Sequence, residues 1–178
     1  MKCFIGIPLP VNIKDKIHPL IEKLKSEFSV GVKYVEKENL HITLYFSGEL
    51  SEKQVEETKK KLHLLDGLGK IKASLGLAGF FPNEGKPHVA WIGLEKGLER
   101  VNSLQARILE ALEVQSDEDF NAHITIARMV SPTDRERLVH LCKQFHDDSE
   151  WEINELVFYK SEFTSAGTKY AKLQEIKL

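Results

Sequence analysis

Two kinds of hydrophobic pattern alternate along the chain. Stretches in which apolar and polar residues alternate predict β-strands, and stretches with apolar residues three or four positions apart predict helices. The predicted strands are Lys2–Pro8, Val32–Val35, Asn39–Phe46, Ile71–Phe80, His88–Leu94, Phe120–Arg128, Trp151–Glu162 and Lys169–Leu178. Helical stripes run from Val11 to Phe28, from Val55 to Leu65, from Leu98 to Leu112 and from Leu138 to Phe145.

Capping and turn residues mark the ends of these elements. Ser51 followed by Gln54 predicts a capping box at the start of the second helix, and Ser131-Pro132 predicts the start of the fourth. The Pro- and Gly-rich segment from Phe81 to Pro87 is typical of a hairpin connection. The acidic segment 116–119 is expected to be a loop.

The resulting order, β-α-β-β-α-β-β-α-β-α-β-β, mixes helices with strands that are joined by tight turns. Antiparallel pairing should therefore dominate. We expect an α+β fold of two pseudo-symmetric lobes, with helices outside and a central cleft. No Ser-, Pro- or Gly-rich linker divides residues 1–178, so the lobes are expected to intertwine in one domain.

Two tetrapeptides stand out within this pattern, His41-Ile42-Thr43-Leu44 and His123-Ile124-Thr125-Ile126. In a strand, each would place its His and Thr on one face and its two apolar residues on the other. Random shuffling of the seven His and six Thr would give roughly 0.2 His-x-Thr pairs, so two similar copies favour a functional reading.

Composition limits the partners and the compartment. The chain has 178 residues, 42% hydrophobic and 29% charged, with a net charge of −2. It therefore has no global attraction for a polyanion, although a local basic patch or a short substrate is compatible with it. The two cysteines lack metal or redox spacing, the apolar start at Lys2–Pro8 is too brief for a signal peptide, and no run suits a membrane span. We expect a cytoplasmic protein, monomeric by default.

A pair of histidines suits a reaction that takes up one proton and releases another, because one imidazole can be neutral while the other is protonated. In-line displacement at phosphorus fits this requirement, and the hydroxyls of Thr43 and Thr125 are candidate donors to the phosphoryl oxygens. Strand parity places Tyr45 on the His41 face, as a stacking surface for a base or as a core aromatic. Arg128 falls on the Ile124 face and could reach a phosphate only if the strand bulges or ends before it.

Competing chemistries fit less well. Each motif supplies one imidazole, and no acidic residue or cysteine lies two positions away on the same face, which argues against a metal site. The Gly-x-Ser-x-Gly element of Ser-His-Asp hydrolases is also absent from the sequence.

The paired motifs resemble those of the two-histidine (2H) phosphoesterase superfamily, and more closely those of the RNA 2′,3′-cyclic phosphodiesterases, historically called 2′-5′ RNA ligases. The similarity spans nearly the whole chain, and its stretches are Lys2–Ile7, Asn39–Gly48, Phe80–Pro82, Val89–Gly93, His123–Arg128 and Tyr159–Phe163, with Gly167 and Tyr170.

This resemblance implies metal-free and cofactor-free opening of an RNA 2′,3′-cyclic phosphate to a 2′-phosphate. His41 would be the proton donor to the leaving 3′ oxygen and His123 the base, while Thr43 and Thr125 would hold the phosphate. The reverse reaction would join tRNA halves by a 2′-5′ bond. Two departures are Ala122, where the family often has Pro, and His88, where it often has Arg. The second leaves open how the site gathers positive charge.

Two alternatives remain: a module that binds RNA ends or nucleotides without turnover, and a 2H phosphoesterase for small cyclic nucleotides. Comparing rates on a mononucleotide, a dinucleotide and a tRNA half would separate the last from an RNA enzyme. Whether ATP or another nucleotide binds is not fixed by these residues.

Overall fold

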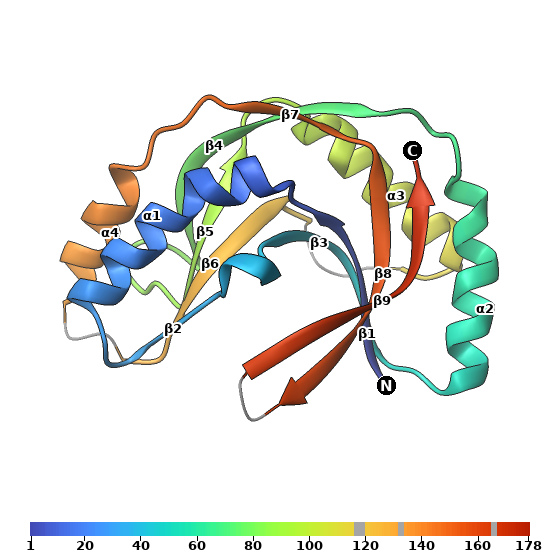
Figure 1. Ribbon diagram of the computed structural model, residues 1–178, viewed down its shortest axis with the longest axis horizontal. Coiled ribbons are helices and arrows are strands. Elements are labelled where there is room, and N and C mark those ends of the chain that lie inside the picture. The colour runs from blue at the N-terminus through green and yellow to red at the C-terminus, as the bar shows by residue number, and fades with distance from the viewer. Residues whose placement is uncertain (116–119, 132–133, 165–166) are drawn as a thin grey trace.

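The described strands form one curled antiparallel sheet, seen edge-on in Figure 1. The computed structural model describes residues 1–115, 120–131, 134–164 and 167–178. Its strands are β1 (Lys2–Pro8), β2 (Val32–Tyr34), β3 (His41–Glu49), β4 (Ile71–Phe81), β5 (Val89–Leu94), β6 (His123–Met129), β7 (Glu150–Ile153), β8 (Glu155–Thr164) and β9 (Gly167–Lys177). Their spatial order is β7-β4-β5-β6-β3-β1-β8-β9, and β2 pairs with the far part of β6.

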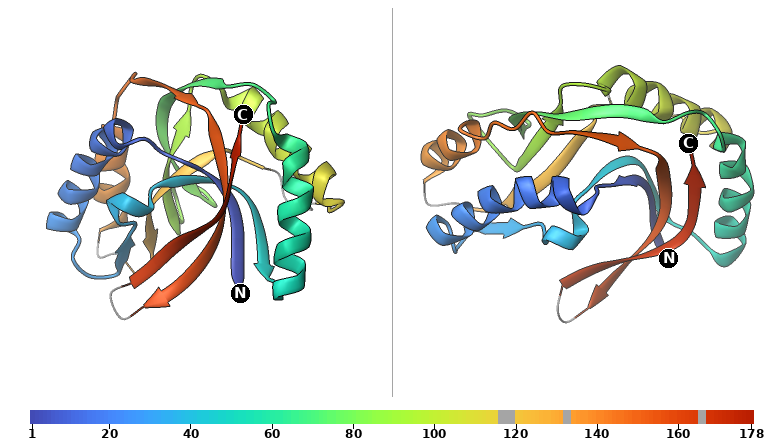
Figure 2. Two further views of the ribbon diagram at one scale, coloured as in Figure 1. Left: turned by 45° about the vertical axis from the view of Figure 1, so that its right-hand side comes forward. Right: turned by 45° about the horizontal axis from the view of Figure 1, so that its top comes forward.

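Helices gather in two pairs on the outside of this sheet. They are α1 (Val11–Glu27), α2 (Glu52–Leu62), α3 (Leu98–Leu112) and α4 (Arg135–Lys143), with 3-10 turns η1 (Lys37–Asn39) and η2 (His63–Leu65). The blue α1 lies beside the orange α4, and the teal α2 lies beside α3 at the opposite end of the molecule (Figures 1 and 2). This is the expected α+β arrangement of two lobes, and it confirms the fold class. No described helix is long and apolar enough to cross a membrane.

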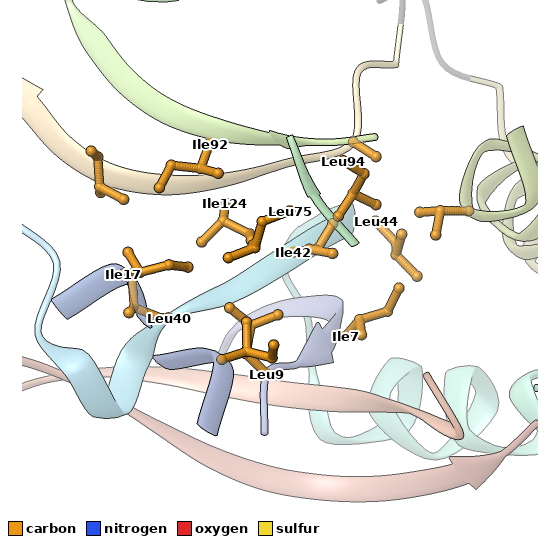
Figure 3. Close-up of a cluster of buried hydrophobic side chains, with 14 of the residues drawn as sticks. Ile7, Leu9, Ile17, Leu40, Ile42, Leu44, Leu75, Ile92, Leu94 and Ile124 are labelled. Carbon is orange, nitrogen blue, oxygen red and sulfur yellow. The ribbon is translucent and has the colours of Figure 1, made fainter. Parts of the chain in front are cut away.

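The main core lies between the helices and one face of the sheet. Its cluster includes Ile17 of α1, Leu62 of α2, Ile108 of α3 and Leu138 of α4, all with 0% exposure. Ile42 and Ile124, the apolar partners within the two motifs, point into the same cluster from the middle of the sheet (Figure 3). The opposite sheet face is therefore the one that presents the polar motif residues.

Several predicted boundaries are confirmed and two need correction. Ser51 and Gln54 form the predicted capping box at α2. The segment Trp151–Glu162 is two strands rather than one, because the chain leaves β4 after β7 and joins β1 as β8. Helix α4 begins at Arg135, capped by the Asp134 side chain, and not at Ser131. Pro19 lies inside α1, which runs through it as the single predicted stripe does.

Two irregular pairings interrupt the alternation of side chains after the motifs. Between β1 and β3, Ile5 pairs with Tyr45 and Gly6 with Thr43, so Leu44 is an extra residue. Between β5 and β6, Ala90 pairs with Ala127 and Trp91 with Thr125, so Ile126 is extra. The extra residue is the fourth position of each tetrapeptide. Past that position, each strand turns the opposite set of side chains toward the motif face.

Candidate active site

The four motif side chains lie around one pairing between the two motif strands. Strands β3 and β6 are antiparallel neighbours that pair at Ile42 and Ile124. His41 and Thr43 flank this pairing on β3, and His123 and Thr125 flank it on β6. Because the strands run in opposite directions, the two histidines lie diagonally across the pairing. We call the sheet face that carries these four side chains the motif face.

Each histidine is oriented by a backbone carbonyl two residues earlier. The Nδ1 atom of His41 lies 2.6 Å from the carbonyl oxygen of Asn39, and Nδ1 of His123 lies 2.6 Å from that of Asn121. A carbonyl oxygen only accepts hydrogen bonds, so Nδ1 carries the proton in both rings and Nε2 has the free lone pair of the neutral form. For His41, the Thr43 hydroxyl donates to that lone pair over 3.0 Å.

The turn before His41 is itself held in place. The side-chain amide of Asn39 donates to the carbonyl of Thr168 on β9 over 2.8 Å. Lys14 of α1 donates to the carbonyl of Glu38 over 2.6 Å. The carbonyl that orients His41 therefore lies on a turn tied to both a helix and a strand far away in the sequence.

An aromatic-Ile-Gly tripeptide on the neighbouring strand supports each histidine. Phe4-Ile5-Gly6 of β1 lies beside His41, and Trp91-Ile92-Gly93 of β5 lies beside His123. The ring centroids of Phe4 and His41 are 4.9 Å apart, and those of Trp91 and His123 are 6.0 Å apart. This repeat was not predicted from the sequence. The similar tripeptides Phe-Ile-Gly and Trp-Ile-Gly are the signal that could have revealed it.

The glycines in these tripeptides leave space for the rings. A Cβ atom on Gly6 would lie 2.8 Å from the Ile42 carbonyl, 3.3 Å from Cδ2 of His41 and 3.5 Å from the Phe4 ring. On Gly93 it would lie 3.2 Å from the Trp91 ring. The rings thus reach over glycine positions, and a side chain at Gly6 would push against His41.

The irregular pairing in β3 changes the expected place of Tyr45. Tyr45 pairs with the buried Ile5 and packs against the main core, so strand parity gives the wrong face for it. Phe46 takes the position on the motif face: it pairs with Phe4, stacks on that ring at 6.1 Å and 9°, and is 59% exposed. Phe46 was not predicted because no local sequence pattern indicates that Leu44 is an extra residue in β3.

The same irregularity in β6 brings Arg128 out of the core. Ala127 is buried where strict alternation would have exposed it, and Arg128 is exposed. Arg128 pairs with Lys33 of β2 on one side and Val89 of β5 on the other. The sequence predicted that Arg128 could reach a phosphate only if the strand bulged or ended before it. The structure contains a bulge at Ile126, two residues before Arg128.

Electrostatics favour the neutral form of both histidines. Burial lowers the pKa of His41 below 6.5, and the charges of Lys14 and His123 lower it further against the opposing hydrogen bond to Asn39. Burial likewise lowers the pKa of His123, with Arg128 adding to the effect and the hydrogen bond to Asn121 opposing it. At neutral pH the unliganded site therefore presents two basic Nε2 atoms.

A cavity of about 510 Å³ adjoins the second motif. Its lining includes Leu77, Trp91, Gly93, Asn121 and His146. Trp91 thus borders both this cavity and the His123 ring. Among the described residues, no three His, Cys, Asp or Glu side chains gather closely enough to hold a metal ion.

Comparison with known proteins assigns the chain to a family. The family model of the 2′-5′ RNA ligase superfamily matches residues 13–163, most of the chain. The chain belongs to the 2′-5′ RNA ligase superfamily. The resemblance seen in the two motifs is thereby confirmed, and the chain is an enzyme of the 2H phosphoesterase type, a phosphoric diester hydrolase.

Full-length relatives and solved structures agree with this superfamily assignment. The chain is 32% identical to an RNA 2′,3′-cyclic phosphodiesterase of Archaeoglobus fulgidus and 33% identical to one of Methanocaldococcus jannaschii, covering 98% of this chain and at least 98% of each relative. The crystal structure of TT0787 of Thermus thermophilus matches with a TM-score of 0.79 and 27% identity over 100% of this chain and 98% of that chain. Escherichia coli LigT complexed with 3′-AMP shares the fold at a TM-score of 0.77, with 22% identity over 99% and 97% of the two chains.

Proposed function

We propose that the chain hydrolyses the 2′,3′-cyclic phosphate at an RNA end to a 2′-phosphate, using His41 and His123 as an acid–base pair without a metal. The observation that carries this proposal is the diagonal placement of two histidines whose Nδ1 atoms are both bound to carbonyls, which leaves both Nε2 atoms for proton transfer. The relatives named RNA 2′,3′-cyclic phosphodiesterase, matched along their whole length, support this substrate class.

In this mechanism the substrate supplies the charge that the site needs. Both histidines have a lowered pKa in the free protein, and a bound phosphate anion favours protonation of one of them. His41 then carries a proton on Nε2. Thr43, whose hydroxyl donates to neutral His41, becomes free to donate to a phosphoryl oxygen, as Thr125 does from the other strand.

Turnover moves two protons in opposite directions. Nε2 of His123 accepts a proton from water as the water oxygen bonds to phosphorus. The bond from phosphorus to the 3′ oxygen breaks, and the proton on Nε2 of His41 passes to that oxygen. The product is a 2′-phosphate with a free 3′ hydroxyl, and exchange with solvent restores both histidines.

The motif face also offers groups for the rest of the nucleotide. Phe46 is an exposed aromatic surface in ring contact with Phe4, so we assign it the base-stacking role that the sequence suggested for Tyr45. Arg128 adds positive charge beside His123. Escherichia coli LigT is described in complexes with 3′-AMP, ATP and NADP+, which fits nucleotide binding by this chain.

The superfamily name motivates ligation as a second activity. A 5′-hydroxyl end in place of water would give its proton to His123 as its oxygen bonds to phosphorus. The 3′ oxygen would leave with the proton of His41, and the product would be a 2′-5′ bond. The cavity is lined by Trp91, whose ring centroid is 6.0 Å from that of His123, and we assign it to the incoming strand. Incubation of paired tRNA halves that carry 2′,3′-cyclic phosphate and 5′-hydroxyl ends tests this activity.

The main test uses an RNA oligonucleotide with a 2′,3′-cyclic phosphate end, incubated with the protein in EDTA and followed by phosphorus NMR. We expect a 2′-phosphate product. A 3′-phosphate would reassign the leaving oxygen. Absence of product with this oligonucleotide, together with turnover of a small cyclic nucleotide, would favour the small-substrate alternative. Binding without any turnover would favour a binding module.

A further inference from the structure

The β8–β9 hairpin carries an aromatic ring on the motif face that the proposed mechanism does not use. The pairing of β1 with β8 ends at Lys2 and Ser161, and the hairpin projects beyond this point (Figures 1 and 2). Tyr159, Ser161 and Phe163 share one face of β8, because side chains alternate along a strand. Tyr159 stacks on the Phe4 ring at 5.0 Å, so this face is the motif face. Phe163 lies on it with 75% exposure.

A cation accompanies this ring. The ammonium group of Lys2 lies 5.3 Å from the centroid of the Phe163 ring. Lys2 pairs with Glu49 of β3, yet among the described residues no carboxylate lies within 4.0 Å of its ammonium group. The positive charge of Lys2 therefore remains open to an anion.

The opposite face of the hairpin has a different character. Lys160 lies 2.6 Å from a carboxylate oxygen of Glu162, and Glu162 pairs with Lys169 across the hairpin. Acidic and basic side chains thus balance one another there. On the motif face of the hairpin, Phe163 pairs with Thr168, so that face offers an aromatic ring, a hydroxyl and the charge of Lys2.

The motif face of β1 leads from the catalytic residues to this cation. Gly6 pairs with Thr43, and Phe4 pairs with Phe46. Lys2 is the next residue of β1 on that face, about 7 Å farther along the strand. In the proposed function the phosphate lies by Thr43 and the terminal base on Phe46. The next groups along the face are then a cation and a second exposed ring.

We propose that Lys2 and Phe163 form a subsite for the RNA strand upstream of the cyclic phosphate. Phe163 stacks on the base of a preceding nucleotide, and Lys2 binds a backbone phosphate. A cation beside an exposed aromatic ring suits single-stranded nucleic acid, and such stacking tolerates any base. This inference rests on the proposed function, which places the terminal nucleotide. It specifies an oligonucleotide as the preferred substrate over a cyclic mononucleotide.

A length series tests the subsite. The substrates are adenosine 2′,3′-cyclic phosphate and oligoadenylates of two, three and four nucleotides that end in a cyclic phosphate. The measured quantity is the ratio of kcat/KM on each oligonucleotide to kcat/KM on the mononucleotide. We expect the wild-type ratio to rise with length. Phe163→Ala should lower it about five- to 100-fold once the strand reaches the ring, and Phe163→Trp should keep it.

The charge of Lys2 is tested in the same series. Lys2→Gln should lower the ratio about two- to fivefold, as loss of one exposed ionic contact does. Matched controls lie at the other side of the molecule. Leu64→Ala removes an apolar side chain with 72% exposure on η2, and Lys53→Gln removes a charge at a side chain with 86% exposure on α2. Both should keep the wild-type ratio at every length.

The outcomes separate the subsite from the proposed function. A ratio that falls in Phe163→Ala only for the oligonucleotides supports the subsite, and the shortest affected length gives the nucleotide that reaches the ring. An unchanged ratio at every length, an equal loss on the mononucleotide, or a loss that Phe163→Trp does not prevent overturns it. If the wild type turns over none of the substrates, the proposed function fails. Calorimetry with the four-nucleotide strand then decides, and equal affinities of wild type and Phe163→Ala overturn the subsite.

Discussion

Ile42 and Ile124 pair at the point where the two motif strands meet, and both side chains have 0% exposure. Each lies between the His and the Thr of its own motif, so one buried contact sets the positions of all four polar side chains on the other face. The pairing also joins the two lobes of the sheet. Stability and catalytic geometry therefore depend on the same two residues.

Truncation of this pairing should cost stability. We expect Ile124→Ala to lower the free energy of unfolding by about 2–5 kcal/mol, because it removes buried methyl groups and leaves a cavity in the core shown in Figure 3. Denaturant unfolding measures the loss. Leu64→Ala, at a side chain with 72% exposure on η2, is the control and should change stability by less than about 0.5 kcal/mol. A loss of that small size in Ile124→Ala would contradict the account.

A side chain at Gly6 should affect catalysis through His41. In Gly6→Ala the new methyl group would lie 2.8 Å from the Ile42 carbonyl and 3.3 Å from the His41 ring, so the ring or the strand must move. We expect at least a tenfold lower kcat, since misplacement of a catalytic group by about 1 Å can cost 100-fold.

Gly85→Ala, in the connection between β4 and β5, provides the control for Gly6→Ala. Its methyl group would approach the end of the Asn83 side chain at 3.3 Å, far from either motif in the sequence. Turnover should match the wild type. Wild-type kcat in Gly6→Ala would show that the ring contact above Gly6 does not position His41.

The lowered pKa values predict an acidic optimum for kcat/KM. As the pH rises through the pKa of the base, His123 becomes neutral and the rate increases. As the pH rises through the pKa of the acid, His41 loses its proton and the rate falls. In the free protein both histidines titrate below 6.5, so kcat/KM should peak below pH 6.5 and decrease toward pH 8. The kcat profile should lie at higher pH, because the bound phosphate stabilises imidazolium. A kcat/KM that still rises above pH 7.5 would exclude this assignment.

Phe46 should matter for substrate binding more than for chemistry. Phe46→Ala is expected to raise KM for an adenine-ended oligonucleotide about five- to 100-fold, the range of one base–aromatic stack, with little change in kcat. Phe46→Trp should restore the low KM, since it retains an aromatic surface. The matched control is Tyr45→Phe, because Tyr45 packs against the core. An unchanged KM in Phe46→Ala would remove the stacking role.

Much of this arrangement could be predicted from the sequence because the patterns are local. Alternation located the strands, and the two His-x-Thr tetrapeptides identified the paired catalytic candidates before any fold was known. The division of Trp151–Glu162 into two strands was not predictable in this way, since it reflects a change of partner from β4 to β1 that no neighbouring residue encodes.

The faces of the residues after each motif were also beyond local inspection. If side chains alternated without interruption, Tyr45 would lie on the motif face and Arg128 in the core. Leu44 and Ile126 are extra residues in their strands, and they reverse both placements. Such an insertion shows only in the register against a partner strand. The pairing of Lys33 with Arg128 depends on the same register.

The most direct test of the central claim compares two substrates in His41→Ala and His123→Ala. One is a normal 2′,3′-cyclic phosphate, and in the other sulfur replaces the bridging 3′ oxygen. A thiolate leaves without needing a proton, because the thiol is far more acidic than the sugar hydroxyl. We predict that both variants lose about 100- to 10,000-fold on the oxygen substrate and that only His41→Ala recovers on the sulfur substrate. Wild-type rates in either variant on the oxygen substrate, or recovery of His123→Ala alone, would contradict the assignment of acid and base.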